Sequence, residues 1–199
     1  MTADESSKIG GLLLAAGGSS RLGQPKQLIE FRGKTLLRRA AETLVDSGCD
    51  PVLVILGAEF ERSQAEVGDL PLKICVNPEW QTGMSSSLTA GLRAIIELEP
   101  ELTAVVVTLC DQPYISTVDI DSLISEYKHE KASVIAAEYS GRTGVPALFP
   151  RELFGELLSL KGDKGARHIL RGLENVNAVK MPHAALDIDT PDDLLEIRE

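Results

Sequence analysis

The chain has 199 residues, of which 43% are hydrophobic and 25% are charged, and its formal net charge is −10 at pH 7. This length suits one domain over residues 1–199, and the acidic balance disfavours binding to nucleic acid or to anionic membranes. The first residues lack the apolar stretch of a signal peptide, and no apolar run reaches membrane-spanning length. Three widely spaced cysteines without a CxxC pattern argue against a zinc site. We therefore expect a protein of the reducing cytoplasm.

Apolar runs alternate with amphipathic segments along the first half of the chain. Short runs rich in branched side chains predict buried strands at residues 9–16, 51–56, 72–76 and 104–109. Apolar residues at helical spacing predict helices at residues 35–47, 59–67, 85–98 and 117–130. Thr35 is the expected N-cap of the first helix. This alternation favours the α/β class, with a single doubly wound, mostly parallel sheet and helices on both faces.

The second half of the chain is less regular. Its apolar segments predict strands at residues 133–138, 145–149 and 178–181, with a turn between the first two. Helices are expected at residues 150–158, 165–172 and 191–198, and Thr190 is the expected N-cap of the last one. Because no linker, low-complexity segment or repeat interrupts the chain, we expect one domain throughout.

The first strand ends in a glycine-rich basic loop, Gly17–Lys26. Glycines let the backbone approach a ligand closely, successive N–H groups form a nest for anions, and Arg21 and Lys26 add cationic donors. The loop is not a P-loop, since Gln24 and Pro25 stand where Lys and Ser or Thr are required, and it lacks the G-x-G-x-x-G pattern. An ordinary glycine turn is the alternative. The two basic residues after a buried strand favour a phosphate-binding loop.

Polar residues also follow two later predicted strands, at Asn77–Ser87 and Asp111–Pro113. Ligands of doubly wound sheets bind beyond the carboxyl ends of the strands, so these segments and the glycine-rich loop are expected to surround one pocket. The three serines at residues 85–87 begin a helix, where hydroxyl and free N–H groups can bind a base, a ribose or a phosphate. Helix capping by one of them is the alternative.

Three aspartates are candidates for holding a cation. Asp111 follows a buried strand, a position suited to a hard divalent ion that bridges phosphates, although a turn-starting aspartate before proline is the alternative. Asp187 and Asp189 alternate along an extended segment, so we expect them to point to opposite faces and only one of them to reach a shared ion. The alternative interpretation of Asp189 is a helix-capping acid beside Thr190, where the helix dipole favours a negative charge.

The loop sequence LAAGGSSRLGQPKQL at residues 14–28 resembles the signature loop of the MobA-like nucleotidyltransferases, in particular the MocA-like branch of molybdenum cofactor cytidylyltransferases. Further matching segments follow in order: NPEWQTGMSSSLTAGL (77–92), CDQPYI (110–115), GVPALFPRELFGELL (144–158), GDKGAR (162–167) and DIDTPDDL (187–194). The set runs through almost the whole chain, and its order makes the resemblance specific.

The resemblance implies a Rossmann-like nucleotidyltransferase fold whose second half forms the acceptor side of a cleft. It implies a Mg²⁺-dependent transfer of a nucleoside monophosphate to the phosphate of molybdopterin, with release of pyrophosphate. The catalytic residues expected on this basis are Arg21, Lys26 and Asp111. The expected metal ligands are Asp111 and Asp189. The nucleotide-binding residues that it implies are Ala15, Ala16, Gly17, Gly18, Arg21, Lys26, Asn77, Gly83, Ser85 and Ser86. An attacking phosphate oxygen is already anionic, so no dedicated base is needed.

The donor implied by the resemblance is CTP, because Ala15-Ala16-Gly17 is similar to the cytosine branch and the guanine branch usually has Ala-Gly-Gly. The chain departs from the family pattern at Gly18, which keeps a glycine pair, at Cys110, where Gly is commoner, and at Val145, where His is frequent. Cytidylyl or guanylyl transfer to a sugar or polyol phosphate is one alternative. A non-catalytic protein that binds a nucleotide or molybdopterin is another. A client molybdoenzyme or its chaperone is the implied transient partner.

Overall fold

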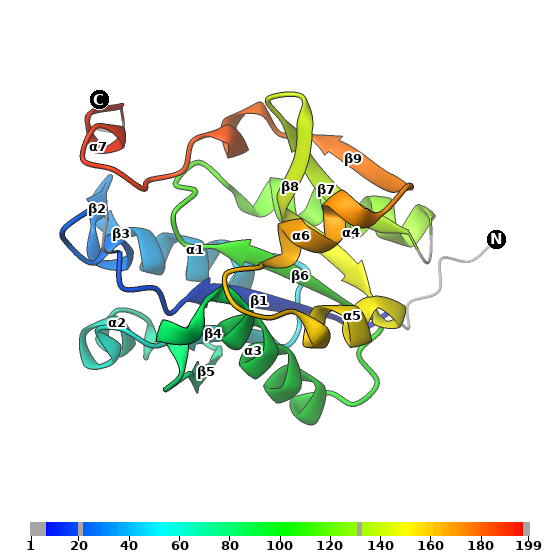
Figure 1. Ribbon diagram of the computed structural model, residues 1–199, viewed down its shortest axis with the longest axis horizontal. Helices are drawn as coiled ribbons and strands as arrows, with labels where there is room; N and C mark the ends of the chain where they lie inside the picture. The colour runs from blue at the N-terminus through cyan, green and yellow to red at the C-terminus, as the bar shows by residue number, and fades with distance from the viewer. Residues whose placement is uncertain (1–6, 20–21, 131–132, 197–199) are drawn as a thin grey trace.

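The computed structural model describes residues 7–19, 22–130 and 133–196 (Figure 1). Its centre is a seven-stranded sheet with the strand order β5-β4-β1-β6-β8-β7-β9. These strands are β1 (Ile9–Ala15), β4 (Val52–Leu56), β5 (Lys73–Val76), β6 (Ala104–Leu109), β7 (Val134–Tyr139), β8 (Arg142–Pro150) and β9 (Val176–Lys180). A separate antiparallel ribbon consists of β2 (Glu30–Phe31) and β3 (Lys34–Thr35).

Helices cover both faces of the sheet (Figure 1). One face is covered by α1 (Leu36–Val45), α2 (Phe60–Val67) and α4 (Thr117–His129). The other is covered by α3 (Met84–Leu98), α5 (Phe154–Ser159) and α6 (Ala166–Gly172). The short helix α7 (Asp193–Glu196) follows near the end of the described chain. No helix among the described residues has the length and apolar character needed to cross a bilayer.

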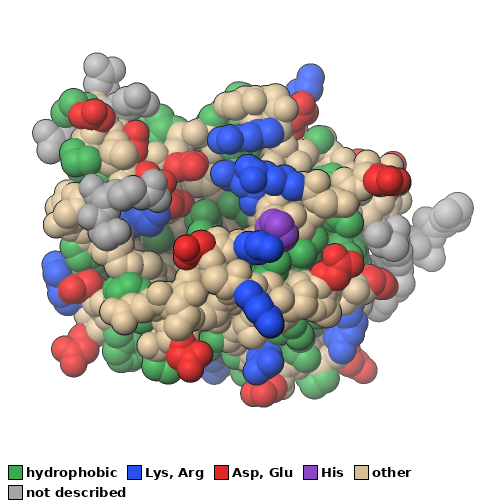
Figure 2. Space-filling view, viewed as in Figure 1, with side chains coloured by type: hydrophobic (Ala, Val, Ile, Leu, Met, Phe, Trp, Pro, Cys, Tyr) green, Lys and Arg blue, Asp and Glu red, His purple; other side chains and the backbone are tan. Residues whose placement is uncertain are grey.

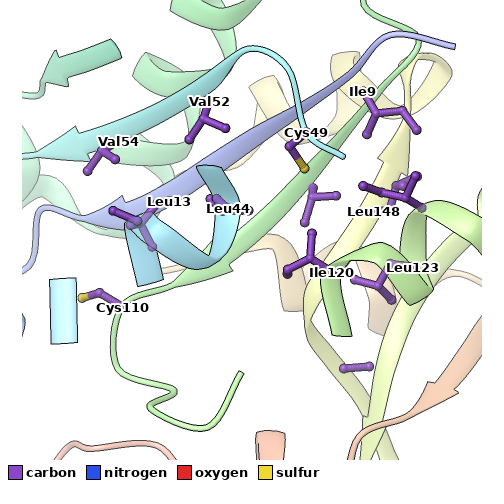
Figure 3. Close-up of a cluster of buried hydrophobic side chains, with 14 of the residues drawn as sticks. Ile9, Leu13, Leu44, Cys49, Val52, Val54, Cys110, Ile120, Leu123 and Leu148 are labelled. Carbon is purple, nitrogen blue, oxygen red and sulfur yellow. The ribbon is translucent and has the colours of Figure 1, made fainter. Parts of the chain in front are cut away.

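Strand β1 lies in the middle of the sheet and pairs in parallel with β4 and β6. Its side chains alternate between the two faces. Leu13 packs in the cluster beneath α1 and α4 (Figure 3), whereas Leu12 and Leu14 pack beneath α3. A strand buried on both faces requires apolar residues at successive positions, which explains the unbroken apolar run that predicted it.

The sheet becomes mixed in the second half of the chain. Strand β8 runs antiparallel to both β6 and β7, while β9 pairs in parallel with β7. The four strands at the other side, β5, β4, β1 and β6, are all parallel. The predicted α/β class and the mostly parallel sheet with helices on both faces are therefore confirmed.

Most predicted elements are present, with ends that differ by a few residues. The first predicted helix begins at Leu36, and the side chain of Thr35 caps it by accepting from the backbone N–H of Arg38 at 3.2 Å. The predicted helix at residues 150–158 is instead a 3-10 turn, Arg151–Leu153, followed by α5. The ribbon of β2 and β3 was not predicted, because two-residue strands are too short to show alternation. Residues 197–198 of the last predicted helix lie outside the described residues.

Candidate active site

The parallel strands β5, β1 and β6 end at one edge of the sheet, and the segments that follow them line a single cavity of about 570 Å³. The wall from the first segment includes Ala15, Ala16, Gly17 and Gly18. The other two segments contribute Trp80, Gln81, Gly83, Met84, Ser87, Cys110 and Asp111. The prediction that three loops surround one pocket is confirmed. Arg21, the second predicted cation of the glycine-rich loop, lies outside the described residues.

Lys26 is the meeting point of three distant segments. Its Nζ donates to Oδ2 of Asp111, after β6, and to Oδ1 of Asp189, near the end of the chain, at 3.1 Å. Its backbone N–H donates to Oγ of Ser19 at 3.0 Å, which closes the glycine-rich loop. Burial opposes the ammonium charge, but the carboxylates of Asp111 and Asp189 outweigh it and raise the pKa of Lys26. Lys26 therefore carries a firmly held positive charge in the cavity wall.

Asp111 is buried, and contacts on both sides hold the backbone around it. Its carbonyl accepts from the backbone N–H of Ile188 at 2.9 Å, which ties the segment at residues 187–189 to the end of β6. The neighbouring Gln112 donates through Nε2 to the carbonyls of Val145 (3.0 Å) and Ala184 (2.9 Å). Oδ1 of Asp111 is buried without a hydrogen-bond partner among the described residues. A buried carboxylate oxygen in this state is available to a ligand from the cavity.

Asp187 and Asp189 both line a second cavity of about 280 Å³, together with Lys26 and Asp111. The expectation that they point to opposite faces is therefore wrong. Strict alternation applies to a strand, and residues 187–189 do not form one, although the intervening Ile188 is fully buried. Burial and the nearby charge of Asp111 raise the pKa of Asp187.

Residues other than Asp189 make the hydrogen bonds that cap the last helix. Oγ1 of Thr190 accepts from the N–H of Asp193 at 3.4 Å. The carboxylate of Asp193 accepts in return from the N–H groups of Thr190 (2.7 Å) and Asp189 (2.9 Å). This reciprocal arrangement has the form of a capping box just before α7, in which Thr190 makes the bonds expected of a capping residue, although α7 begins at Asp193 and not at residue 191. Oδ1 of Asp189 is directed to Lys26 instead.

The carboxylates of Asp111 and Asp189 are close enough to share one cation, because the Lys26 ammonium contacts both. These two carboxylates, which include the unpartnered Oδ1 of Asp111, form a set of hard oxygen donors. Magnesium prefers such donors and commonly uses one or two carboxylates with waters and substrate phosphates. Within the described ranges, no three His, Cys, Asp or Glu side chains are grouped to hold a metal by themselves. The residues therefore fit an ion that is bound jointly with a triphosphate.

Of the serine run, the structure brings Ser87 to the cavity wall. Ser85 and Ser86, the two that were predicted to bind nucleotide, are not part of the lining. The hydroxyl of Ser86 lies 2.8 Å from the carbonyl of Gly83, to which it donates. Asn77 is buried, and its Nδ2 donates to the hydroxyls of Ser86 (2.8 Å) and Ser87 (3.0 Å). Asn77 thus orients Ser86 and Ser87. In the sequence, the only sign of this role is a polar amide side chain between a predicted strand and a predicted helix.

Trp80 and Asp163 line the larger cavity and were not predicted as site residues. Trp80 packs across the glycine-rich loop. A Cβ on Gly18 would lie 2.8 Å from the Trp80 ring, and a Cβ on Gly57 would lie 2.8 Å from the Cβ of Trp80. Two positions without side chains thus make room for the indole. Both residues occur in the matching segments, but the motif alone did not show which side chains face the ligand.

The loop at residues 162–165 presses on the start of α3. The carbonyl of Gly162 accepts from the N–H of Ser85 at 3.1 Å. Gly83 has a φ of +117°, and a Cβ at this position would lie 2.4 Å from the carbonyl carbon and oxygen of Gly162. Gly83 is therefore required both by its backbone conformation and by the close approach of this loop.

Residues 11–178 match the family model described as the MobA-like NTP transferase domain. The chain belongs to the MobA-like family. It is a MobA-like nucleotidyltransferase, and the predicted family membership is confirmed. The family implies a nucleoside triphosphate substrate, and the larger cavity with its glycine loop and Lys26 lies where such a substrate is expected.

Several named proteins are similar to this MobA-like chain. It is 36% identical over 170 residues to the nicotine blue oxidoreductase of Paenarthrobacter nicotinovorans, covering 81% of this chain and 80% of that one. It is 27% identical to the purine catabolism protein PucB of Bacillus subtilis, over 94% and 95% of the two chains. Identity to the molybdenum cofactor cytidylyltransferase of Escherichia coli is 25%, over 94% of both chains.

Solved structures agree with this MobA-like fold. Rv0371c of Mycobacterium tuberculosis superposes with a TM-score of 0.81 at 27% identity, over 98% of both chains. Its homologue from Mycobacterium sp. strain JC1 has a TM-score of 0.81 at 33% identity, over 94% of this chain and 93% of that one. A further structure of Rv0371c is a complex with manganese. It superposes with a TM-score of 0.78 at 26% identity, over 96% of this chain and 97% of that one.

Proposed function

We propose that this protein transfers CMP from CTP to the phosphate of molybdopterin and releases pyrophosphate. The observation that carries the proposal is the meeting of two cavities at Lys26, Asp111 and Asp189, which line both. The larger cavity is formed by the glycine-rich loop and the start of α3, and it suits a triphosphate donor. The smaller one is formed partly by the second half of the chain and suits an acceptor.

The reaction joins two phosphates. An oxygen of the acceptor phosphate attacks the α-phosphorus of CTP and forms a new P–O bond. The bond from the α-phosphorus to the oxygen that bridges to the β-phosphate breaks, and pyrophosphate leaves with that electron pair. The attacking oxygen is anionic at neutral pH, so the protein's task is alignment and neutralisation of charge.

Lys26 is the described side chain best placed for this neutralisation, because its charged ammonium lies at the junction of the two cavities. Arg21 is proposed as a second cation of the same loop. Asp111 and Asp189 would hold the magnesium ion, whose chemistry is to neutralise charge on the transferring phosphate. The manganese complex of Rv0371c supports a divalent ion in this family. When phosphates enter, Lys26 is free to exchange its carboxylate partners for phosphate oxygens.

The preference for CTP is proposed on Ala15 and Ala16, which line the larger cavity and resemble the cytosine branch of the family. The relative named molybdenum cofactor cytidylyltransferase supports both the donor and the acceptor. Base selectivity depends on a small number of contacts, so it is the part of the proposal that one or two substitutions would redirect.

The test is a competition in one tube. The protein is incubated with magnesium, molybdopterin and equal concentrations of CTP and GTP, and the dinucleotide product and pyrophosphate are quantified. Predominant cytosine dinucleotide with one pyrophosphate per product supports the proposal, and predominant guanine dinucleotide overturns the donor. Transfer to a sugar or polyol phosphate in preference to molybdopterin overturns the acceptor. Binding of CTP without any transfer indicates a non-catalytic binding protein.

A redox control belongs in the same experiment, because a relative at 36% identity is named an oxidoreductase. The preparation is supplied with NADH or NADPH and an artificial electron acceptor, and loss of the reduced nicotinamide is followed by absorbance. Consumption of the nicotinamide together with no nucleotide transfer overturns the proposed function.

A further inference from the structure

The lining of the smaller cavity is partly apolar and partly charged. Leu14, Val107, Leu109 and Val145 line its apolar part. Its acidic lining consists of Asp111, Asp163, Asp187 and Asp189. A phosphate that enters this cavity is repelled by these carboxylates unless a cation accompanies it. The cationic side chains in the lining are Lys26 and Arg167.

Arg167 differs from Lys26 in its partners. The Lys26 ammonium is paired with two carboxylates, whereas no carboxylate of the described residues lies within salt-bridge distance of the Arg167 guanidinium. The charge of Arg167 acts on Asp187 from farther away and lowers its pKa in part, against the larger effects of burial and of Asp111. Arg167 therefore has most of its hydrogen-bonding capacity left for a ligand in the cavity.

A buried tyrosine holds the Arg167 guanidinium in place. Nη2 of Arg167 donates to Oη of Tyr139 at 2.9 Å, and Tyr139 is 2% exposed at the end of β7. Gly144 makes room for this hydroxyl, because a Cβ there would lie 2.1 Å from Oη. A guanidinium has five N–H donors, so four remain after this bond. A fixed planar fork of this kind suits bidentate binding of a phosphate.

The surface beside this cavity is basic although the whole chain is acidic. Residues 161–171 contain four basic residues, Lys161, Lys164, Arg167 and Arg171, and one acidic residue, Asp163, which gives a local formal charge of 4 − 1 = +3. The chain as a whole has a net charge of −10. Figure 2 shows Lys and Arg side chains gathered in a column on this face, over α6 and the loop before it. Such a local field attracts anionic ligands to the cavity.

We propose that Arg167, positioned by Tyr139, binds the phosphate of the acceptor in the smaller cavity. The acceptor class is then a phosphomonoester whose body is apolar or planar enough to lie on Leu14, Val107, Leu109 and Val145. This inference rests on the proposed function, which supplies the acceptor whose phosphate is bound. It adds a phosphate-binding residue, Arg167, and a positioning residue, Tyr139, that the motifs did not identify.

The kinetic test compares matched variants of the full chain. Arg167→Ala is expected to raise KM for the acceptor by about 10- to 100-fold, since a hydrogen-bonded charge contributes about 1.5–3 kcal/mol. Its affinity for CTP, followed by the emission of Trp80, changes less than about twofold. Arg167→Lys retains the charge without the fork and recovers part of the loss. Tyr139→Phe keeps the ring and raises KM for the acceptor more than it lowers kcat.

Arg171→Ala is the control, because it removes the same charge from an exposed position of the same helix that is not part of the cavity lining. It is expected to change KM for the acceptor less than about threefold. Equal effects of Arg167→Ala and Arg171→Ala would mean that only the general field of the surface acts, and they overturn the proposal. An Arg167→Ala protein with unchanged KM for the acceptor overturns it as well.

A binding experiment separates this proposal from the proposed function. Phenyl phosphate serves as a small aromatic phosphomonoester, and its binding is followed by phosphorus NMR line broadening without any transfer reaction. Broadening with wild type and Arg171→Ala, but not with Arg167→Ala, supports the subsite even if CTP is never transferred. Equal broadening with all three proteins overturns it. Arg167→Lys replaces Arg167→Ala if thermal melts show that the alanine variant is unfolded.

Discussion

The ammonium of Lys26 and the carboxylate of Asp111 form an ion pair between residues that are 85 positions apart in the sequence. The side chain of Asp111 is 8% exposed and that of Lys26 is 21% exposed, so water screens the pair only weakly. The pair joins the loop after β1 to the end of β6, and the second bond of Lys26 adds Asp189. Lys26 thus has a structural role in the ligand-free protein besides the role proposed for it in phosphate binding.

Replacing Lys26 by Met is expected to reduce the free energy of unfolding by about 1–3 kcal/mol, because it leaves the buried Asp111 carboxylate without its partner. Urea unfolding measures the effect. The control is Lys34→Met, which breaks an exposed ion pair with Glu42 at 2.6 Å and should cost at most about 1 kcal/mol. Equal losses in the two variants would contradict the structural role of Lys26.

The contribution of the Lys26 ion pair depends on pH in a direction that its pKa sets. The pKa of Lys26 is raised above its ordinary value of 10.5, so the folded protein holds this proton more tightly than the unfolded chain. The stabilisation is therefore complete below pH 10.5 and is lost as the pH rises through the raised pKa. The difference in unfolding free energy between wild type and Lys26→Met should be constant from about pH 7 to 9 and decrease above 10.5. A difference that grows with alkaline pH would refute this assignment.

Asp111→Asn is expected to lower the rate of nucleotide transfer by about 100-fold or more, because it removes a proposed ligand of the ion that neutralises the transferring phosphate. Since Lys26 then loses its main partner, we also expect a modest loss of stability in the ligand-free protein. Asp189→Asn should be similarly impaired and need more magnesium for half-maximal activity. The matched control is Asp163→Asn, an exposed acid that lines both cavities. Wild-type magnesium dependence in Asp111→Asn would exclude the proposed metal site.

Trp80 is the one tryptophan of the chain and lines the larger cavity, so the protein's tryptophan fluorescence reports on the surroundings of that cavity. Addition of CTP with magnesium should change its emission in a saturable way, and the same protein heated with CTP should show a higher melting temperature. At 100 times the dissociation constant the stabilisation is about 2.7 kcal/mol. Trp80→Phe serves as the control, since it abolishes the optical signal while thermal stabilisation continues to report binding. A thermal shift without any change in emission would place the nucleotide elsewhere.

Gly83→Ala is expected to destabilise the fold by about 1–3 kcal/mol, because alanine is strained at a φ of +117° and its Cβ would collide with Gly162. The collision also displaces the loop at residues 162–165 from the cavity edge, so CTP affinity should fall. Gly155→Ala is the control: it lies in α5, and a Cβ there meets no atom within 4 Å. That change should be neutral or stabilise by up to about 1 kcal/mol in thermal unfolding. Equal melting temperatures for the two variants would contradict this description of the loop.

Local sequence pattern was sufficient to predict the mostly parallel sheet, most of its helices and the sheet edge that carries the candidate site. The apolar run of β1, buried on both faces, and the helical spacing after Thr35 depend on contacts that repeat every few residues. Once the parallel strands are known, the carboxyl ends of β1 and β6 must lie at one edge of the sheet. The convergence of the glycine-rich loop with Asp111 on one cavity follows from that geometry, and the residues of the loop that are described confirm it.

The direction of single side chains was decided by packing between segments that are far apart in the chain. Asp187 and Asp189 face one cavity because the segment is not a strand and its backbone is tied to Asp111, which no local pattern specifies. Likewise, the bond between Arg167 and Tyr139 joins α6 to β7 across 28 positions. Periodicity places a residue on an element, but only the packed structure determines which distant groups its polar atoms reach. The sheet edge therefore followed from the sequence, and the partners of Lys26 and Arg167 required the tertiary structure.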